Sequence, residues 1–128
     1  MVDSLLSEVR AALTFSQPGL EITQQSDHIR AVGPFALTPR EPNALDHGPL
    51  RTYVVDLRFP LNYPEDAPVV RELSGAFEHN ERFHCSADGT CCICVWEHWL
   101  ATCEDNSVHE YVNGPVHNYF LREPLNWR

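Results

Sequence analysis

The sequence predicts a single α+β domain spanning residues 1–128, with a helix at each end and an antiparallel four-stranded meander between them. Three observations support this. Apolar residues recur at helical spacing near both termini, they alternate in the middle of the chain, and the links between the alternating segments are short. Short links force antiparallel pairing, because a parallel crossover needs a dozen or more residues. A length of 128 residues, 43% of them hydrophobic, is ordinary for one globular domain.

The first helix is predicted from a capping position at Asp3 and Ser4 to about Phe15. Gln17-Pro18-Gly19 ends it, because proline and glycine both disfavour helix continuation. Its apolar face is formed by Leu5, Leu6, Val9, Ala12 and Leu13.

Two short strands are predicted next, at Leu20–Gln24 and Ile29–Leu37, with Ser26-Asp27 as their turn and a proline-rich loop over residues 39–49. The clearest strand is Arg51–Phe59, which stops at Pro60. Its inward side chains are predicted to be Tyr53, Val55, Leu57 and Phe59, while the side chains between them, Asp56 included, point outward. Val69, Val70 and Leu73 supply the fourth strand.

Residues 74–94 follow no regular period, and an irregular segment of this length inside a small domain usually has a function. A short helical turn is expected at Glu97–Leu100. Ser107 and Glu110 form a capping box that opens the last helix, and Pro115 should kink that helix. Its apolar face is predicted to be Val108, Tyr111, Val112, Val116 and Phe120.

The charge balance argues against polyanionic partners. Nine basic residues face eighteen acidic ones, which gives a net charge of −9 and disfavours nucleic acid and anionic lipid surfaces. The sequence has no apolar run of membrane-spanning length. Because the N-terminal residues lack both the basic start and the apolar stretch of a secretory signal, we expect a cytoplasmic protein.

All nine basic residues are arginine, and the chain contains no lysine. One interpretation is the codon bias of a GC-rich genome. The other is functional: a protein that carries a reactive acyl group is protected by the absence of lysine amines, because a neutral amine is a nucleophile whereas a guanidinium is inert.

Four of the five cysteines lie within ten residues, which indicates a local thiol site rather than a disulfide framework. Catalysis, zinc binding and simple burial all remain open as interpretations of this cluster. The zinc ligands would come from Cys85, Cys91, Cys92, Cys94 and His84, but the spacing lacks a Cys-x-x-Cys knuckle, so we expect no metal. Cys92 and Cys94 would share one face of a strand and are a candidate redox pair.

Two motifs resemble the ubiquitin-conjugating (UBC) enzyme family. The strand beginning at Tyr53 and its exit through Asn62-Tyr63-Pro64 resemble that family's third strand and proline turn. Gly89-Thr90-Cys91-Cys92-Ile93 resembles its Gly-x-x-Cys-Leu active-site segment, in which the cysteine is the nucleophile. The resemblance implies a UBC-like fold and assigns the nucleophile to Cys92, with no cofactor.

The short spacing and the segment Glu110–Leu121 are more similar to the bacterial branch, namely the stand-alone conjugating-enzyme-like proteins of CBASS anti-phage operons. That resemblance implies that Cys92 takes the C-terminal glycine carboxyl of a cGAS-like nucleotidyltransferase as a thioester and passes it to an amine. The alternative is a non-catalytic binding module of the same fold.

One departure concerns the family's His-Pro-Asn segment, whose asparagine helps to hold the oxyanion. Here the corresponding residues are Arg82-Phe83-His84-Cys85, and Asn80 is nearby but out of register. His84 is interpreted as a brace for the loop, with general base as the alternative. The candidates that would orient or deprotonate an attacking amine are Asp88, Glu97 and His98, and Cys94 is a further supporting candidate.

Overall fold

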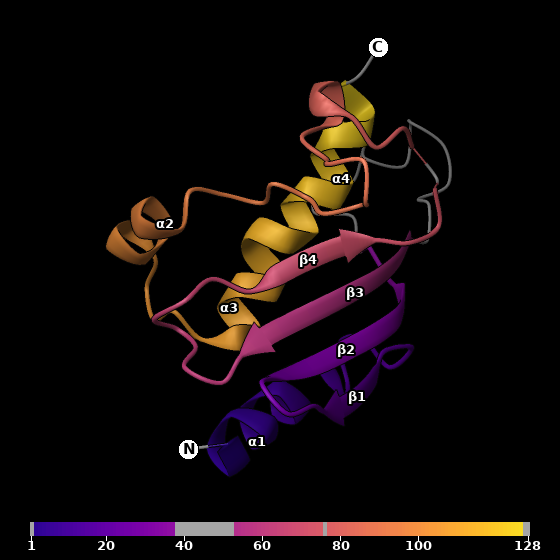
Figure 1. Ribbon diagram of the computed structural model, residues 1–128. Coiled ribbons are helices and arrows are strands. Elements are labelled where there is room, and N and C mark those ends of the chain that lie inside the picture. Colours follow the sequence, from indigo (N-terminus) through magenta and orange to yellow (C-terminus); the bar gives the residue numbers. More distant parts are fainter. Residues whose placement is uncertain (1, 38–52, 76, 127–128) are drawn as a thin grey trace.

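The structure is a computed structural model that describes residues 2–37, 53–75 and 77–126 (Figure 1). Its strands are β1 (Glu21–Gln24), β2 (His28–Phe35), β3 (Tyr53–Pro60) and β4 (Val69–Glu72). Its helical elements are α1 (Val2–Leu13), the 3₁₀ turn η2 (Glu81–Phe83), α2 (Trp96–Thr102), α3 (Val108–Tyr111), the π-helical turn η3 (Val112–Val116) and α4 (His117–Asn126).

The four strands form one antiparallel sheet in the order β1-β2-β3-β4, so the predicted α+β meander is confirmed. Several strand ends differ from the prediction by one or two residues: β1 begins at Glu21 rather than Leu20, and β2 spans His28–Phe35 rather than Ile29–Leu37. Pro60 is the last residue of β3 rather than its stop, a strand position that tolerates a residue without an N–H. Leu73 lies beyond β4 and is 43% exposed. The predicted loop 39–49 and the start of the Arg51–Phe59 strand lie outside the described residues.

The core lies between the sheet and the C-terminal helices. Figure 1 shows α3 and α4 crossing one face of the sheet. The ring of Phe120 on α4 lies 5.0 Å from Tyr53 and 5.8 Å from Phe35, so the terminal helix packs directly on β2 and β3. The predicted inward side chains of β3 and the predicted apolar face of the last helix are all buried: Tyr53, Val55, Leu57, Phe59, Val108, Tyr111, Val112, Val116 and Phe120.

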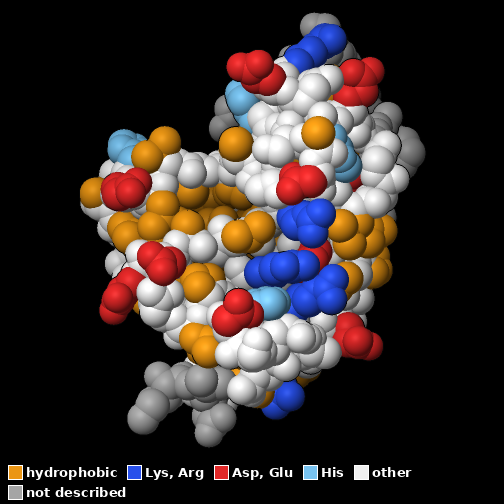
Figure 2. Space-filling view, viewed as in Figure 1, with side chains coloured by type: hydrophobic (Ala, Val, Ile, Leu, Met, Phe, Trp, Pro, Cys, Tyr) orange, Lys and Arg blue, Asp and Glu red, His pale blue; other side chains and the backbone are white. Residues whose placement is uncertain are grey.

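The opposite face of the sheet carries charge. Asp56 is predicted to point to solvent, yet it is only 1% exposed, because Arg30 and Arg58 cover it. The guanidinium groups of Arg30 and Arg58 both donate hydrogen bonds to the Asp56 carboxylate at 3.1 Å. Burial opposes ionisation of Asp56, but these hydrogen bonds and charges outweigh it and lower the pKa. Figure 2 shows basic side chains gathered near the middle of the viewed face.

Helix α1 begins at Val2, so the predicted cap at Asp3 and Ser4 is wrong. It ends at Leu13, and Phe15 beyond it is 92% exposed. The apolar face is otherwise as predicted: Leu5, Val9, Ala12 and Leu13 are buried and Leu6 is half-buried. The Glu8 carboxylate accepts the Val108 N–H at 2.8 Å, which joins α1 to the first turn of α3.

One half of the predicted capping box is present. The Ser107 hydroxyl accepts the Glu110 N–H at 3.1 Å. The reciprocal bond is absent, because Asp105 accepts the Ser107 N–H and the Glu110 carboxylate accepts two other backbone N–H groups. At Pro115 the chain forms the π-helical turn η3, which accommodates a residue without a backbone donor. Among the described residues, no helix is both long enough and apolar enough to cross a bilayer.

Candidate active site

The free edge of β4 positions the segment that leads to Cys92. Because β4 is the last strand of the sheet, the backbone groups along its outer edge can pair with a further segment of the chain. Residues 89–91 pair with this edge: the Glu72 N–H donates to the Gly89 carbonyl at 2.8 Å, and the Cys91 N–H donates to the Val70 carbonyl at 2.7 Å. The residue that follows, Cys92, is exposed.

The same segment folds back on residues 84–86 as a short hairpin. The Cys92 N–H donates to the His84 carbonyl, and the Ser86 N–H donates to the Thr90 carbonyl, both at 2.8 Å. The Asp88 carboxylate closes the turn by accepting the Thr90 N–H at 3.0 Å. We call residues 84–92 the Cys92 hairpin. The backbone at Cys92 is therefore held from two sides: Cys91, the residue before it, pairs with β4, and the Cys92 N–H is bonded within the hairpin.

His84 braces this hairpin through its backbone. It follows η2 in the left-handed conformation, with φ of 52°, and its carbonyl accepts the Cys92 N–H. Its side chain is exposed. The main-chain bond does not depend on the imidazole, so the role of the His84 side chain, as a brace or as a base, stays a prediction.

Tyr119 on α4 holds the hairpin from the core side. Its buried hydroxyl donates to the Phe83 carbonyl at 2.7 Å. It also lies 3.5 Å from the His84 carbonyl oxygen. Sequence reasoning missed Tyr119. The one available signal was its position next to the predicted core residue Phe120, and that position does not indicate a hydrogen bond.

Glu72, at the end of β4, was also missed by sequence reasoning. It anchors residues 74–79, the segment that leads from β4 toward the hairpin. Its buried carboxylate accepts the Ser74 and Gly75 N–H groups at 2.8 Å, the Ser74 hydroxyl, and His79 Nε2 at 3.0 Å. Burial opposes its ionisation, but the hydrogen bonds from Ser74, His79 and the backbone outweigh it and lower the pKa of Glu72. No local pattern distinguishes this glutamate from a solvent-facing one.

The supporting residues predicted around Cys92 fall into two groups. Asn80 and Asp88 lie with the hairpin: the Asn80 carbonyl accepts the Cys85 N–H at 3.1 Å, and Arg71 donates to the Asp88 carbonyl at 3.0 Å. The hydrogen bond from the Thr90 N–H lowers the pKa of Asp88, which therefore stays anionic. Within the described residues, the buried Asn80 Oδ1 has no hydrogen-bond donor.

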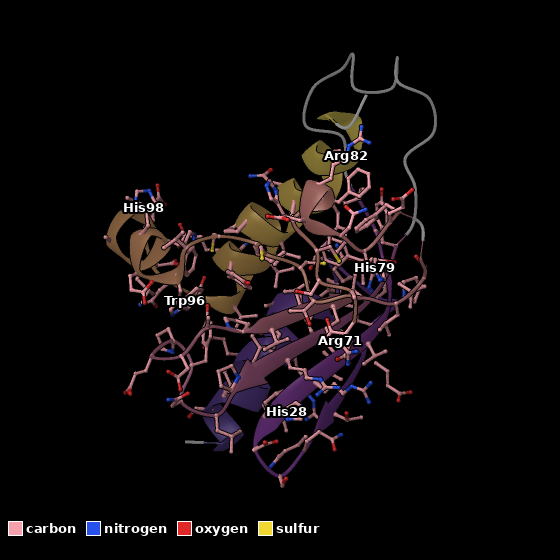
Figure 3. All side chains as sticks on the ribbon, turned by 45° about the horizontal axis from the view of Figure 1, so that its top comes forward. His28, Arg71, His79, Arg82, Trp96 and His98 are labelled. Carbon is pink, nitrogen blue, oxygen red and sulfur yellow. The ribbon has the colours of Figure 1, made fainter. Side chains whose placement is uncertain are left out.

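Glu97 and His98 are exposed on α2, away from η2. Figure 3 shows His98 at the opposite end of the view from Arg82 and His79. The helix, predicted as Glu97–Leu100, extends over Trp96–Thr102. Asp88 is thus the acidic candidate that lies within the Cys92 hairpin itself, while Glu97 and His98 lie on the helix that follows it.

Aromatic packing joins α2 to the proline turn after β3. The Trp96 indole donates to the Pro64 carbonyl at 3.1 Å, and its ring lies 5.9 Å from Tyr63 and 5.0 Å from Trp99. The Tyr63 hydroxyl donates to the Asn106 carbonyl at 2.7 Å. The Tyr-Pro turn is therefore joined by one packed aromatic cluster to α2, the helix that follows the Cys92 segment.

The cysteines separate into buried and exposed thiols. Cys85 and Cys91 are buried, Cys92 and Cys94 are exposed, and Cys103 is half-buried. Desolvation of the thiol raises the pKa of Cys94, even though the residue as a whole is exposed. No group of three or more histidine, cysteine or acidic side chains among the described residues is arranged to hold a metal ion. The geometry therefore gives no support to the zinc interpretation.

The chain matches no protein-family model, and no curated protein matches it. The chemistry of the site therefore has to follow from its own geometry.

Proposed function

We propose that this protein is a ubiquitin-conjugating-enzyme-like acyl transferase of bacterial anti-phage defence, with Cys92 as the nucleophile. The observation that supports it most is the exposed Cys92 thiol at the end of a hairpin that is held by β4, His84 and Tyr119. Acyl transfer needs an accessible thiol whose backbone does not move during attack, because misplacement costs rate steeply.

In the proposed reaction, the Cys92 thiolate attacks an activated carbonyl carbon and the activating group leaves with its electron pair. An amine then attacks the thioester, loses a proton, and the Cys92 thiolate departs. The anionic Asp88 in the same hairpin is the proposed group that orients the amine. The proposed donor is the C-terminal carboxyl of a cGAS-like nucleotidyltransferase that ends in glycine.

The test uses a synthetic glycine-ending peptide supplied as a thioester of a small thiol, so that no activating enzyme is needed. The parent should form a covalent adduct that reductant removes. Cys92→Ala should abolish the adduct, and Cys92→Ser should give at most a reductant-stable ester. Cys103→Ala is the matched control and should leave the adduct intact. An adduct that survives in Cys92→Ala and disappears in Cys94→Ala would show that the nucleophile is assigned to the wrong thiol.

His84→Asn separates the two roles of His84. Asparagine tolerates the left-handed conformation and keeps the carbonyl that accepts the Cys92 N–H, but it cannot accept a proton near neutral pH. If His84 is only a brace, the rate of adduct formation should stay within about twofold of the parent at every pH. Loss of a pH-dependent limb in the variant would identify the imidazole as a base.

A further inference from the structure

Cys85 and Cys91 are directly opposite each other in the Cys92 hairpin. They exchange no backbone hydrogen bond, because the Cys85 N–H donates to the Asn80 carbonyl and the Cys91 N–H donates to the Val70 carbonyl. The hydrogen-bonded rungs of the hairpin, from Cys92 to His84 and from Ser86 to Thr90, lie on either side of them. The two cysteines are therefore a non-hydrogen-bonded antiparallel pair, the arrangement in which opposite side chains lie closest.

The geometry of such a pair suits a disulfide. Opposite Cα atoms at a non-hydrogen-bonded position are about 4.5 Å apart, within the range of about 4.4–6.8 Å that a disulfide spans. The Cys85 thiol donates to the Ser86 carbonyl at 3.6 Å, and the Cys91 thiol donates to the Gly89 carbonyl at 3.4 Å. We propose that Cys85 and Cys91 are a site of oxidative modification, where a reversible disulfide forms across the hairpin and leaves Cys92 as a free thiol.

The chemistry balances with hydrogen peroxide as the oxidant. The Cys85 thiolate attacks one peroxide oxygen, the O–O bond breaks, and hydroxide leaves to give a sulfenic acid. The Cys91 sulfur then attacks the Cys85 sulfur, the S–O bond breaks, and water leaves. The two thiols lose two protons and two electrons, and the peroxide becomes two water molecules.

The order of the two steps follows from the surroundings of each thiol. Burial raises the pKa of both thiols, and the rise is larger at Cys91, so Cys85 is the thiol that ionises more readily. Cys85 is 4% exposed and Cys91 is 6% exposed, so the pair lies just below the surface and within reach of a small oxidant only. Oxidation would join the two arms of the Cys92 hairpin covalently.

The test is independent of the proposed acyl transfer, because its readout is mass alone. The full chain is treated with hydrogen peroxide, its free thiols are alkylated, and it is digested without reduction. Cleavage before Asp88 separates Cys85 from the other four cysteines, and fragmentation identifies the partner. We expect the loss of two hydrogens per chain, a Cys85–Cys91 cross-link that reductant removes, and an alkylated Cys92.

Variants sharpen the assignment. Cys92→Ser and Cys94→Ser should retain the cross-link, and Cys91→Ser should lose it. Mapping of the parent decides the matter even if Cys91→Ser does not fold. A cross-link that joins Cys92 to another cysteine, or complete alkylation of Cys85 after peroxide treatment, would overturn the proposal.

Discussion

Gly89 is the position where the Cys92 hairpin is most sensitive to one added methyl group. Its φ is +94°, in the region that side-chain-bearing residues rarely adopt. A Cβ built there would lie 2.5 Å from the Glu72 carbonyl oxygen, which is main chain of β4 and has no rotamer to change. The hairpin must therefore move away from β4 in a Gly89→Ala variant.

The expected cost combines two parts. The left-handed conformation costs an alanine about 1–2 kcal/mol relative to glycine. Separation of the hairpin from β4 also weakens the 2.8 Å hydrogen bond from the Glu72 N–H to the Gly89 carbonyl, worth about 0.5–1.5 kcal/mol. We therefore expect Gly89→Ala to lower the free energy of unfolding by about 1.5–3.5 kcal/mol.

Urea denaturation of two matched glycine variants isolates the close contact. Gly75 also has a positive φ, +68°, but nothing lies within 4 Å of the place that an added methyl group would occupy, so Gly75→Ala should cost about 1 kcal/mol. Gly114 has neither constraint, so Gly114→Ala should be neutral or stabilising. Equal losses in Gly89→Ala and Gly75→Ala would refute the argument from the Glu72 carbonyl.

Three further outcomes follow from the site. Tyr119→Phe removes the bond to the Phe83 carbonyl and should cost about 1–3 kcal/mol in urea denaturation, and an unchanged midpoint would show that water replaces the hydroxyl. Glu72 has a lowered pKa, so its ionised form stabilises the fold above its usual pKa and this contribution is lost as the pH falls. Glu72→Gln should therefore be less stable than the parent near neutral pH, with a gap that narrows in acid, whereas the exposed Glu21→Gln should show no such trend. Elemental analysis of protein purified without chelator should find far less than one zinc per chain, and stoichiometric zinc released by Cys91→Ser would favour the metal interpretation.

The sequence predicted the elements whose side chains repeat and missed the contacts that hold the site. Alternation identified the inward residues of β3, and helical spacing identified the apolar face that ends at Phe120. Both patterns are local, because each reports burial of one face of a regular element.

The contacts around Cys92 are not local. The Tyr119 hydroxyl reaches a carbonyl 36 residues away, and Glu72 is ionised in the interior only because four donors surround it. The pairing of Cys85 with Cys91 depends on the turn at Gly89. From the sequence alone, the segment that contains this turn could be described only as irregular. The thiol cluster could thus be located from the sequence, but its division into a buried pair, Cys85 and Cys91, and an exposed pair, Cys92 and Cys94, could not.

The absence of lysine allows a direct test of the acyl intermediate. If Cys92 carries a thioester, an amine within reach of it should capture the acyl group, because effective concentrations within one molecule are high. Arg82→Lys on η2, Thr90→Lys in the hairpin and Glu97→Lys on α2 each introduce one such amine. Intact mass should show the adduct of each variant passing from a reductant-sensitive to a reductant-stable form, at a rate that falls with distance from Cys92.

Thr23→Lys is the matched control. Thr23 is exposed on β1, at the opposite edge of the sheet from the hairpin, about 19 Å away across four strand spacings. A lysine there adds the same amine beyond the reach of Cys92, so its adduct should last as long as that of the parent. If all four variants keep the thioester equally long, the missing lysines reflect codon usage alone, and the acceptor amine must be activated by groups that none of these positions contacts.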